Sequence, residues 1–280
     1  MRWLVIGATG LLGPRFMDAI NARGWTSISA ARNGAEVTVD LTDDDALNHT
    51  LSVLDVDGVV NCAANIYVDK CEEDPGGAYA VNTRPLSLLA DWSIANQKPL
   101  LQVSTDHYFT TGERALQTET TPVDLVNEYA RSKWLAEHLA LRSPHALVLR
   151  TNIVGGAKGH GRWVVESLKN KSPMTLFMDF YSSPIHVAAM ADVSMTLAEK
   201  KATGIYNVSS RDVSSKGEFI YAVARALNIT PDWVQEGSGR QLATKRAMCL
   251  GLDVTKAEKT LGYALPTLEE TAKALAEESL

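Results

Sequence analysis

Tyr129 and Lys133 are the residues whose types and spacing most directly suggest chemistry. They lie four residues apart in the strongly helical stretch NEYARSKWLAEH, so a helix places them on one face, about one turn apart. An ammonium beside a phenol favours the phenolate and lowers the phenol's pKa from its ordinary value of ~10. Such a phenol can give or take a proton at a reacting carbonyl near neutral pH. The same spacing also occurs in helices without a catalytic role, so other residues have to support this interpretation.

A glycine-rich turn near the start of the chain is typical of phosphate binding. Gly7, Gly10 and Gly13 follow the apolar run Trp3–Ile6, and the stretch from there to Ile20 predicts a helix. Glycine permits the positive φ of a tight turn and leaves room for a phosphate beside the backbone. The N–H groups at the start of the helix then point at the anion, so the segment predicts a pyrophosphate site.

Polar residues end a buried strand farther along the chain. In LLQVSTDHYF the apolar strand stops at Ser104, Thr105 and Asp106, at the kind of sheet edge where ligands bind. These side chains either contact a ligand or simply end the strand. Asn82, in AYAVN, is likewise either functional or a polar residue of a long helix.

Short apolar strands alternate with amphipathic helices in the first half of the chain. This alternation predicts a parallel sheet covered on both faces, and right-handed crossovers make it a doubly wound α/β fold. Ligands bind at the carboxyl ends of such strands, where the loops after residues 6, 31, 62 and 103 come together. The predicted strands are Trp3–Ile6, Ser27–Ala31, Glu36–Val39, Gly58–Cys62, Leu100–Val103 and Ala146–Arg150, and the predicted helices span residues 11–23, 43–54, 75–97 and 127–142.

The regular alternation ends after Arg150. The sequence then predicts a glycine-rich loop, a helix over 162–170, strands over 174–178 and 204–209, a helix over 214–228 and an acidic amphipathic helix over 267–279. We therefore expect a dinucleotide-binding domain in residues 1–151. Residues 152–280 are expected to form a smaller substrate-binding region that partly returns to the Rossmann core.

Composition and charge exclude several classes of function. The chain of 280 residues carries a net charge of −6 with a pI near 5.6, so nucleic acid is not an expected partner. No apolar run approaches the ~20 residues that cross a bilayer, and the first one is too short for a secretory signal. The three cysteines and six histidines are scattered, without disulfide or metal-ligand spacing. These observations predict a cytoplasmic protein with no membrane partner and no metal.

Taken together, these features resemble the extended short-chain dehydrogenase/reductases, and within them the dTDP-4-dehydrorhamnose reductase group. The group's pattern is similar to VVNCAANIYVDKCEEDP (59–75), AYAVN (78–82), STDHYF (104–109), YARSKWLAE (129–137) and the tail LDVTKAEKTLGYALP (252–266). The resemblance implies an NAD(P)-binding Rossmann fold and a reductase that acts on a keto group of a nucleotide-linked sugar.

The resemblance also implies a role for each matching residue. Thr105 matches the hydroxyl that binds the substrate carbonyl, Tyr129 the proton donor, and Lys133 the residue that holds the nicotinamide ribose and lowers the tyrosine pKa. Asn82 falls near the family's structural asparagine, which supports a proton relay. The implied cofactor contacts are Gly7, Thr9, Gly10, Leu11, Leu12, Gly13, Arg32, Asp40, Leu41, Cys62, Ala63, Ala64, Asn82, Tyr129 and Lys133, among which Asp40 and Leu41 match a pair that contacts adenine.

The residue after the second strand predicts which dinucleotide binds. Sites for NAD usually place a carboxylate there to bind the ribose 2′-hydroxyl, whereas sites for NADP place an arginine. Here the strand ends Ala30-Ala31-Arg32-Asn33, and Arg32 would make a charge-assisted contact with a 2′-phosphate. We therefore expect NADPH, with NAD as the alternative, unless Arg32 is only a solvated surface residue.

Substrate recognition departs from the reductase pattern. A tryptophan that commonly lies two residues after an Arg-Thr pair is Ile153 here, and an Asn-Phe-Val segment is replaced by Arg162-Trp163-Val164. Three positions of the run Asp179–Ile185 also differ. Arg162 suits a phosphate or carboxylate, or is a solvated arginine. The expected substrate contacts are Val68, Thr105, Asp106, Asn152, Ile153, Arg162 and Pro184.

Three functions follow from these residues. The leading one is the NADPH-dependent reductase, and the alternatives are a sugar-nucleotide epimerase and a non-catalytic NADP-binding regulatory subunit. The beta subunit of methionine adenosyltransferase, which resembles the same group, exemplifies the last. A 4,6-dehydratase is not expected, because Thr105-Asp106 is followed by His107 where those enzymes carry a glutamate. In this superfamily the helices matching 78–97 and 127–142 often pair across a dimer, so a homodimer is expected.

Overall fold

The computed structural model describes residues 1–278, and the chain divides into two units. The first unit comprises residues 1–105, 127–150 and 191–206, and the second comprises 106–126, 151–190 and the chain from 207 onward. Residues 106–126, which we expected within the dinucleotide-binding domain, thus belong to the second unit. Residues 191–206, in contrast, return to the first.

A seven-stranded sheet forms the centre of the first unit, in the order β11-β6-β5-β4-β1-β2-β3. All pairings from β6 to β3 are parallel. The inner strands are almost continuously apolar because both of their faces are covered. This arrangement confirms the predicted doubly wound α/β fold. The bounds are Arg2–Ile6 (β1), Thr26–Ala31 (β2), Val37–Thr38 (β3), Gly58–Asn61 (β4), Leu100–Val103 (β5), Ala146–Arg150 (β6) and Gly204–Asn207 (β11).

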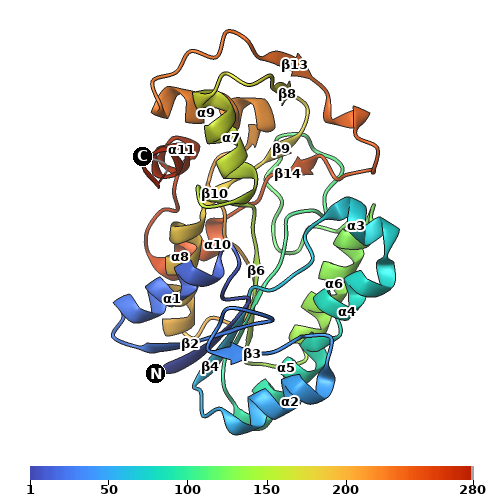
Figure 1. The fold of residues 1–280 in the computed structure, drawn as a ribbon, viewed down its shortest axis with the longest axis vertical. Helices are drawn as coiled ribbons and strands as arrows, with labels where there is room; N and C mark the ends of the chain where they lie inside the picture. The colour runs from blue at the N-terminus through green and yellow to red at the C-terminus, as the bar shows by residue number, and fades with distance from the viewer. Residues whose placement is uncertain (279–280) are drawn as a thin grey trace. The chain divides into compact units, whose positions relative to one another are not determined.

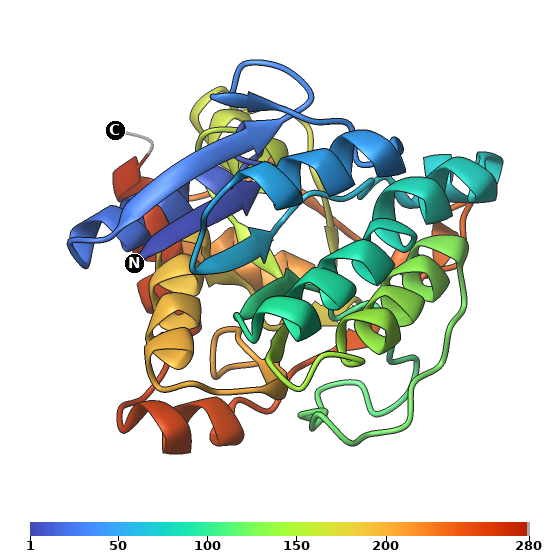
Figure 2. The same cartoon turned by 90° about the horizontal axis from the view of Figure 1, so that it is seen from below.

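Helices cover both faces of this sheet, as Figures 1 and 2 show. On one face lie α1 (Gly13–Ala22) and the part of α8 (Val187–Glu199) that belongs to the first unit. Arg23 joins them, donating to Asp192 O at 3.0 Å and Thr196 Oγ1 at 2.7 Å. On the other face lie α2 (Asp44–Val53), α5 (Pro85–Asn96) and α6 (Glu128–Ala140). The apolar core on this side includes Leu4, Ile6, Leu47, Leu86, Leu89, Leu100, Ala136 and Ala140.

The helix predicted over 75–97 is in fact two helices, α4 (Pro75–Asn82) and α5, which corrects the prediction. Pro85 has no N–H to donate, and its ring clashes with the carbonyl one turn earlier, so a continuous helix cannot pass it. Thr83 caps the junction by donating its hydroxyl to Ser132 O at 2.8 Å. Asn82 therefore stands at the end of a helix, next to α3 (Val68–Glu73), which the sequence did not predict.

The second unit combines short strands with helices around its own apolar core. Its core includes Val164, Leu168, Leu176, Phe219 and Leu275. β12 and β14 flank β9, β7 pairs with β10, and β8 pairs with β13. The strand bounds are Ile153–Val154 (β7), Thr175–Phe177 (β8), Tyr181–Ser182 (β9), Ile185–His186 (β10), Ser214–Ser215 (β12), Gln235–Gly237 (β13) and Cys249–Leu250 (β14). The helices are α7 (Gly159–Lys169), α9 (Lys216–Ala226), η1 (Gly239–Gln241), α10 (Thr255–Leu261) and α11 (Leu268–Glu278).

Besides α3, the helices α8 and α10 have no counterpart in the predictions. α8 is apolar around most of its circumference, so it lacks the periodicity that marks a surface helix, and α10 is only seven residues long. The helix predicted over 267–279 is α11, and residue 279 lies outside the described residues. Within residues 1–278, every helix is too short or too polar to cross a membrane.

Candidate functional site

The turn between β1 and α1 holds the three predicted glycines at residues 7, 10 and 13. Gly7 has φ +85°, and a Cβ there would lie 2.7 Å from Ala63 N. A Cβ on Gly13 would collide with Gly7 O, so neither position accepts a larger residue. Leu12 is the N-cap of α1 and has no side-chain oxygen to bind the first N–H groups of the helix. This turn, with Thr9 and Leu11 in it, therefore offers backbone donors to an anion.

The ends of β2 and β3 carry the residues expected to select the cofactor. Arg32 directly follows β2 and is exposed. Asp40 accepts hydrogen bonds from the Thr42 N–H (2.9 Å) and hydroxyl (2.8 Å). These bonds hold the pKa of Asp40 below its ordinary value, and the charge of Arg32 lowers it further. Arg32 and the Asp40–Leu41 pair are thus neighbours, and Leu41 is buried.

The segment after β4 lies against the glycine turn. The Cys62 N–H donates to Ile6 O at 3.0 Å, and its thiol donates to the same oxygen at 3.1 Å. Burial raises the pKa of Cys62 to about 12, so the thiol stays protonated. Ala63 is the residue that a side chain at position 7 would strike, and Ala64 beside it is half-buried. The predicted contacts from β1 and β4 therefore meet at one edge of the sheet.

Asn82 fixes the loop that follows β4. Its side chain is 1% exposed and binds both backbone groups of Asn65: Oδ1 accepts from the N–H at 2.7 Å, and Nδ2 donates to the carbonyl at 3.0 Å. Nδ2 also donates to Ser132 Oγ at 2.9 Å, and that hydroxyl donates to Tyr129 O at 2.8 Å. Asn82 thus connects the loop after β4 to the helix that carries Tyr129.

Tyr129 and Lys133 lie on α6 one turn apart and are both buried, at 8% and 2% exposure. Tyr129 packs in an apolar cluster with Val68, Cys71 and Ala78, so Val68, a predicted substrate contact, belongs to the wall around the phenol. Lys133 Nζ donates to the carbonyl of Val103, the last residue of β5, at 2.8 Å. Thr105 follows two residues later and is also buried.

Burial also sets the charge of Lys133. It lowers the pKa of this ammonium to about 8, and the carboxylate of Glu137 opposes the shift. Glu137 is fully buried and forms an ion pair with Arg150, 2.7 Å between Oε2 and Nη2. The Ser104 hydroxyl donates to Glu137 Oε1 at 2.6 Å. A buried acid, tied to the ends of β5 and β6, therefore helps to keep Lys133 protonated near neutral pH.

The second unit carries the remaining predicted substrate residues. Asn152 Nδ2 donates to Asp106 Oδ2 at 2.6 Å, so these two are brought together, and Asp106 is 1% exposed. Ile153 begins β7 and pairs with Ile185 of β10, which directly follows the buried Pro184. His107 Nε2 lies 3.9 Å from Asp106 Oδ1.

Arg162 does not join this group. More than half of its side chain is exposed, and its guanidinium pairs with Glu166 on the next turn of α7 at 2.7 Å. Of the two interpretations offered by the sequence, this geometry favours the solvated arginine. An exposed pair of this kind contributes little to stability, so nothing in it requires a ligand.

Several residues around the site were not identified from the sequence. Glu137 could have been found, because it lies four residues after Lys133 and on the same helix face. Lys216 and His160 carried no signal, since only the packing of α7 against α9 brings their side chains near each other. Among residues 1–278, no group of three or more His, Cys, Asp or Glu residues is placed to hold a metal.

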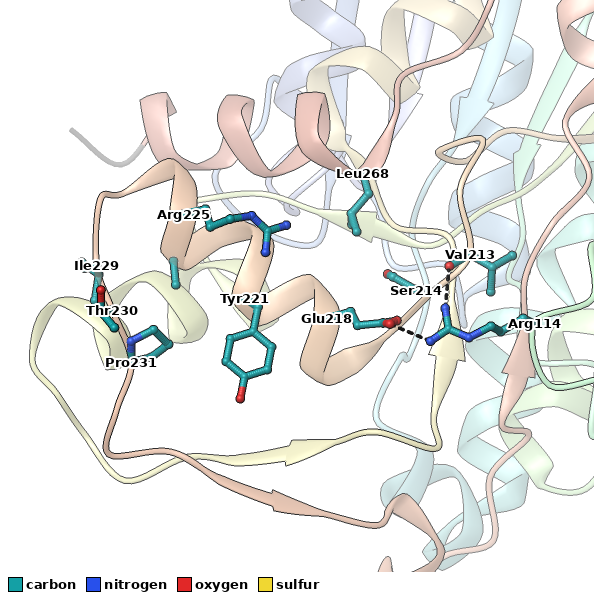
Figure 3. Close-up of a pocket in the computed structure, with 11 residues that line it drawn as sticks. Arg114, Val213, Ser214, Glu218, Tyr221, Arg225, Ile229, Thr230, Pro231 and Leu268 are labelled. Atoms are coloured by element: carbon teal, nitrogen blue, oxygen red, sulfur yellow. Dashed lines mark hydrogen bonds and ion pairs between the residues drawn. The ribbon is translucent and has the colours of Figure 1, made fainter.

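The second unit also has a pocket of about 550 Å³ beside α9, shown in Figure 3. Arg114 at one end donates to Glu218 Oε1 at 2.6 Å and to Val213 O at 3.4 Å. Arg225, which lies on α9 together with Glu218, pairs with Glu269. Both arginines of the pocket are therefore neutralised by carboxylates, and none of the predicted site residues lines it.

Comparison with known proteins places these observations in a family. A family profile described as "RmlD substrate binding domain" matches residues 1–280. A protein of Haloferax volcanii, named "Probable low-salt glycan biosynthesis reductase Agl14", is 30% identical over 97% of this chain and 96% of its own length. The crystal structure of a hypothetical dTDP-4-dehydrorhamnose reductase from Sulfolobus tokodaii superposes with a TM-score of 0.87, at 29% identity over 97% of this chain and 99% of that one. A dTDP-4-dehydrorhamnose reductase from Bacillus anthracis in complex with NADP has the same fold, with a TM-score of 0.88 at 20% identity over 98% and 96% of the two chains.

Proposed function

Because this chain belongs to the RmlD substrate-binding-domain family, within the extended short-chain dehydrogenase/reductases, we propose that it is an NADPH-dependent reductase of a nucleotide-linked keto sugar. The observation that carries the proposal is the buried Tyr129–Lys133 pair on α6, with Lys133 bound to the end of β5. A buried ammonium beside a phenol at a strand end suits proton transfer to a carbonyl.

The first unit fits a dinucleotide. A side chain at Gly7 or Gly13 would collide with the backbone, so the turn keeps the close approach that a pyrophosphate needs. Arg32 supplies a cation for a 2′-phosphate, and the NADP complex of the Bacillus anthracis protein is in keeping with that choice. Residues 7–13, Arg32, the Asp40–Leu41 pair, residues 62–64 and Lys133 would hold the cofactor. When bound, a reduced nicotinamide supplies the hydride.

The residues of this chain supply the proton and the orientation. Tyr129 would donate its Oη proton to the oxygen of the substrate carbonyl. Lys133 would favour the resulting phenolate by its charge, which Glu137 helps to maintain. The Thr105 hydroxyl would bind the same carbonyl oxygen, and the apolar wall of Val68 and Cys71 would exclude water from the phenol.

The relatives and the second unit support the proposed substrate class. The relatives named dTDP-4-dehydrorhamnose reductase indicate a nucleotide-linked 4-keto sugar. Asp106 and Asn152, which form one hydrogen-bonded pair, would contact hydroxyl groups of the sugar. We also propose that the protein is a homodimer. Because Cys62, Cys71 and Cys249 are free thiols, we further propose that it works in the reducing cytoplasm.

The test is loss of nicotinamide absorbance when the pure protein is mixed with NADPH and dTDP-linked 4-keto sugars. Tyr129→Phe should lower the rate by roughly a hundredfold or more, the loss expected for a general acid. Tyr263→Phe is the matched control, because Tyr263 is exposed on the surface, and it should leave the rate unchanged.

Other outcomes separate the alternatives. An epimerase would convert the sugar without net consumption of NADPH. A regulatory subunit would bind NADPH, turn over no sugar nucleotide and be recovered with a partner protein. An unchanged rate in Tyr129→Phe would overturn the proton-donor assignment.

A further inference from the structure

Lys216 is a cation inside the second unit that the proposed reaction does not yet use. It is the first residue of α9, its backbone N–H donates to Phe180 O at 2.8 Å, and its side chain is half-buried. Nζ lies 5.5 Å from the centre of the Phe180 ring. Within residues 1–278 the ammonium forms no hydrogen bond and no ion pair shorter than 4 Å. Taking an ammonium partly out of water without a partner is costly, so a ligand that supplies the partner is the natural explanation.

The groups around Lys216 have an excess of positive charge. The charge of Lys216 acts on His107 and His160, and that of Arg246 also acts on His107. Asp106 is the acid that acts on Lys216. However, Asp106 already accepts a hydrogen bond from Asn152 at 2.6 Å. The carboxylate that acts on Lys216 is therefore already engaged by Asn152.

Aromatic rings make the environment of Lys216 partly apolar. The His160 ring stacks on Trp163, with 5.5 Å between centroids, and on Phe219, with 6.2 Å. Burial is the main cause that lowers the pKa of His107 to about 3. Its imidazole is therefore neutral at pH 7 and can donate one N–H. In such an environment an ammonium attracts an anion more strongly than it does at the surface.

We propose that Lys216, with His107 and Arg246, binds an anionic oxygen group of the substrate, either a phosphate or a carboxylate. This inference rests on the proposed function for the substrate class and adds a charge requirement to it. The group could come from the diphosphate of the nucleotide or from a carboxylate on the sugar. Arg162, the other candidate cation, already has a carboxylate partner in Glu166 at the surface.

Calorimetric titration of the full chain distinguishes the two sources. The probes are dTDP, which carries the diphosphate without a sugar, and glucuronate, which carries a sugar carboxylate without a nucleotide. Lys216→Met should weaken at least one of them by tenfold or more, and Lys216→Arg should restore binding to within about threefold. Lys273→Met is the matched control, because Lys273 is an exposed lysine of the same unit, and it should change neither affinity. A loss confined to dTDP assigns the diphosphate, and a loss confined to glucuronate assigns the sugar carboxylate.

The melting temperature without ligand gives a second readout. Lys216→Met should melt at the same temperature as the wild type or higher, because the variant no longer buries a charge. A lower melting temperature would give Lys216 a purely structural role and overturn the proposal. Equal affinities in wild type and Lys216→Met, or no binding of either probe to wild type, would also overturn it. NADPH binding and NADPH oxidation are measured separately, so failure of the reductase assignment is recognised independently.

Discussion

The side-chain amide of Asn82 pairs with the backbone of Asn65 as one strand pairs with another. Oδ1 accepts the Asn65 N–H at 2.7 Å, and Nδ2 donates to the Asn65 carbonyl at 3.0 Å. The same Nδ2 reaches Ser132 on α6 at 2.9 Å. The Asn82 side chain therefore satisfies the backbone groups of the loop after β4, as a neighbouring strand would. It also connects that loop to α6, the proposed catalytic helix.

Replacing Asn82 by alanine should therefore destabilise the first unit. The two half-buried backbone groups of Asn65 lose their partner, at a cost of ~1–3 kcal/mol for each group left unsatisfied, and the Ser132 hydroxyl loses one of its two hydrogen bonds. We expect a lower free energy of unfolding in urea and weaker NADPH binding. Asn96→Ala is the control, because Asn96 makes a single exposed hydrogen bond to Trp92 O, and it should cost less than ~0.5 kcal/mol. Equal stabilities of the two variants would contradict this role.

Glu137 should set the alkaline limit of activity through Lys133. Since the pKa of Lys133 is about 8, the ammonium is present below that pH and is lost as the pH rises through it. We expect kcat/KM for reduction to fall above about pH 8. Glu137→Gln removes the charge that opposes this loss, so the fall should begin at lower pH, whereas Glu137→Asp should keep it near its original position. An unshifted profile in Glu137→Gln would show that the carboxylate serves only the ion pair with Arg150.

Arg32 should determine the preference between the two nicotinamide cofactors. A hydrogen bond to a charged group contributes ~1.5–3 kcal/mol, or roughly a tenfold to hundredfold change in affinity. Arg32→Ala should raise the KM for NADPH by that factor and leave the KM for NADH nearly unchanged. Arg142→Ala, which removes an exposed arginine paired with Asp91, is the control. Equal effects on both cofactors would assign Arg32 to the adenosine rather than to a phosphate.

The fold was predictable because its signals are local. Continuous apolar strands alternate with helices, and this pattern alone identifies a parallel sheet covered on both faces. The helix break at Pro85 could also have been predicted from the proline itself. The apolar residues on either side of it nevertheless suggested one continuous helix. α8 could not be predicted from periodicity, because its apolar circumference reflects burial that only the folded chain creates.

The site was predictable only where a motif carries the chemistry. Gly7, Tyr129 and Lys133 are recognisable by spacing, because a tight turn and a helix face are local properties. Glu137 and Arg150 meet through packing of α6 against the sheet, and nothing in their own segments indicates the pair. Lys216 is a still clearer case, since its environment comes from residues distant in sequence, such as Asp106 and His160.

His107, which is half-buried, should make the protein sensitive to acid. Its pKa is about 3 when folded, below the ordinary 6.5. Below pH 6.5 the histidine is protonated in the unfolded chain but stays neutral in the folded chain. The free energy of unfolding therefore falls as the pH drops towards 4. His107→Asn should make the melting temperature less dependent on pH between 6.5 and 4.5. His49→Asn, at an exposed position of α2, should leave that dependence as it is.

The proposed dimer can be tested on α5 and α6. These helices pack together in the first unit and leave Ile94 and Leu135 exposed, at 42% and 38%. If they pair with a second copy, Leu135→Glu should convert the dimer into a monomer in sedimentation velocity at micromolar concentration. Val53→Glu, at an exposed apolar residue of α2, should leave the dimer intact. A wild-type protein that is already monomeric would contradict the prediction.

The interleaving of the two units limits how this protein can exchange parts with its relatives. The first unit is encoded in three separate stretches, and residues 191–206 contribute the outermost strand, β11. A single crossover in the gene after residue 151 would therefore deliver a sheet without its last strand and leave β6 as an open edge, a site for aggregation. New substrate preferences in such a fold arise more readily by point substitution within the second unit than by recombination of whole segments.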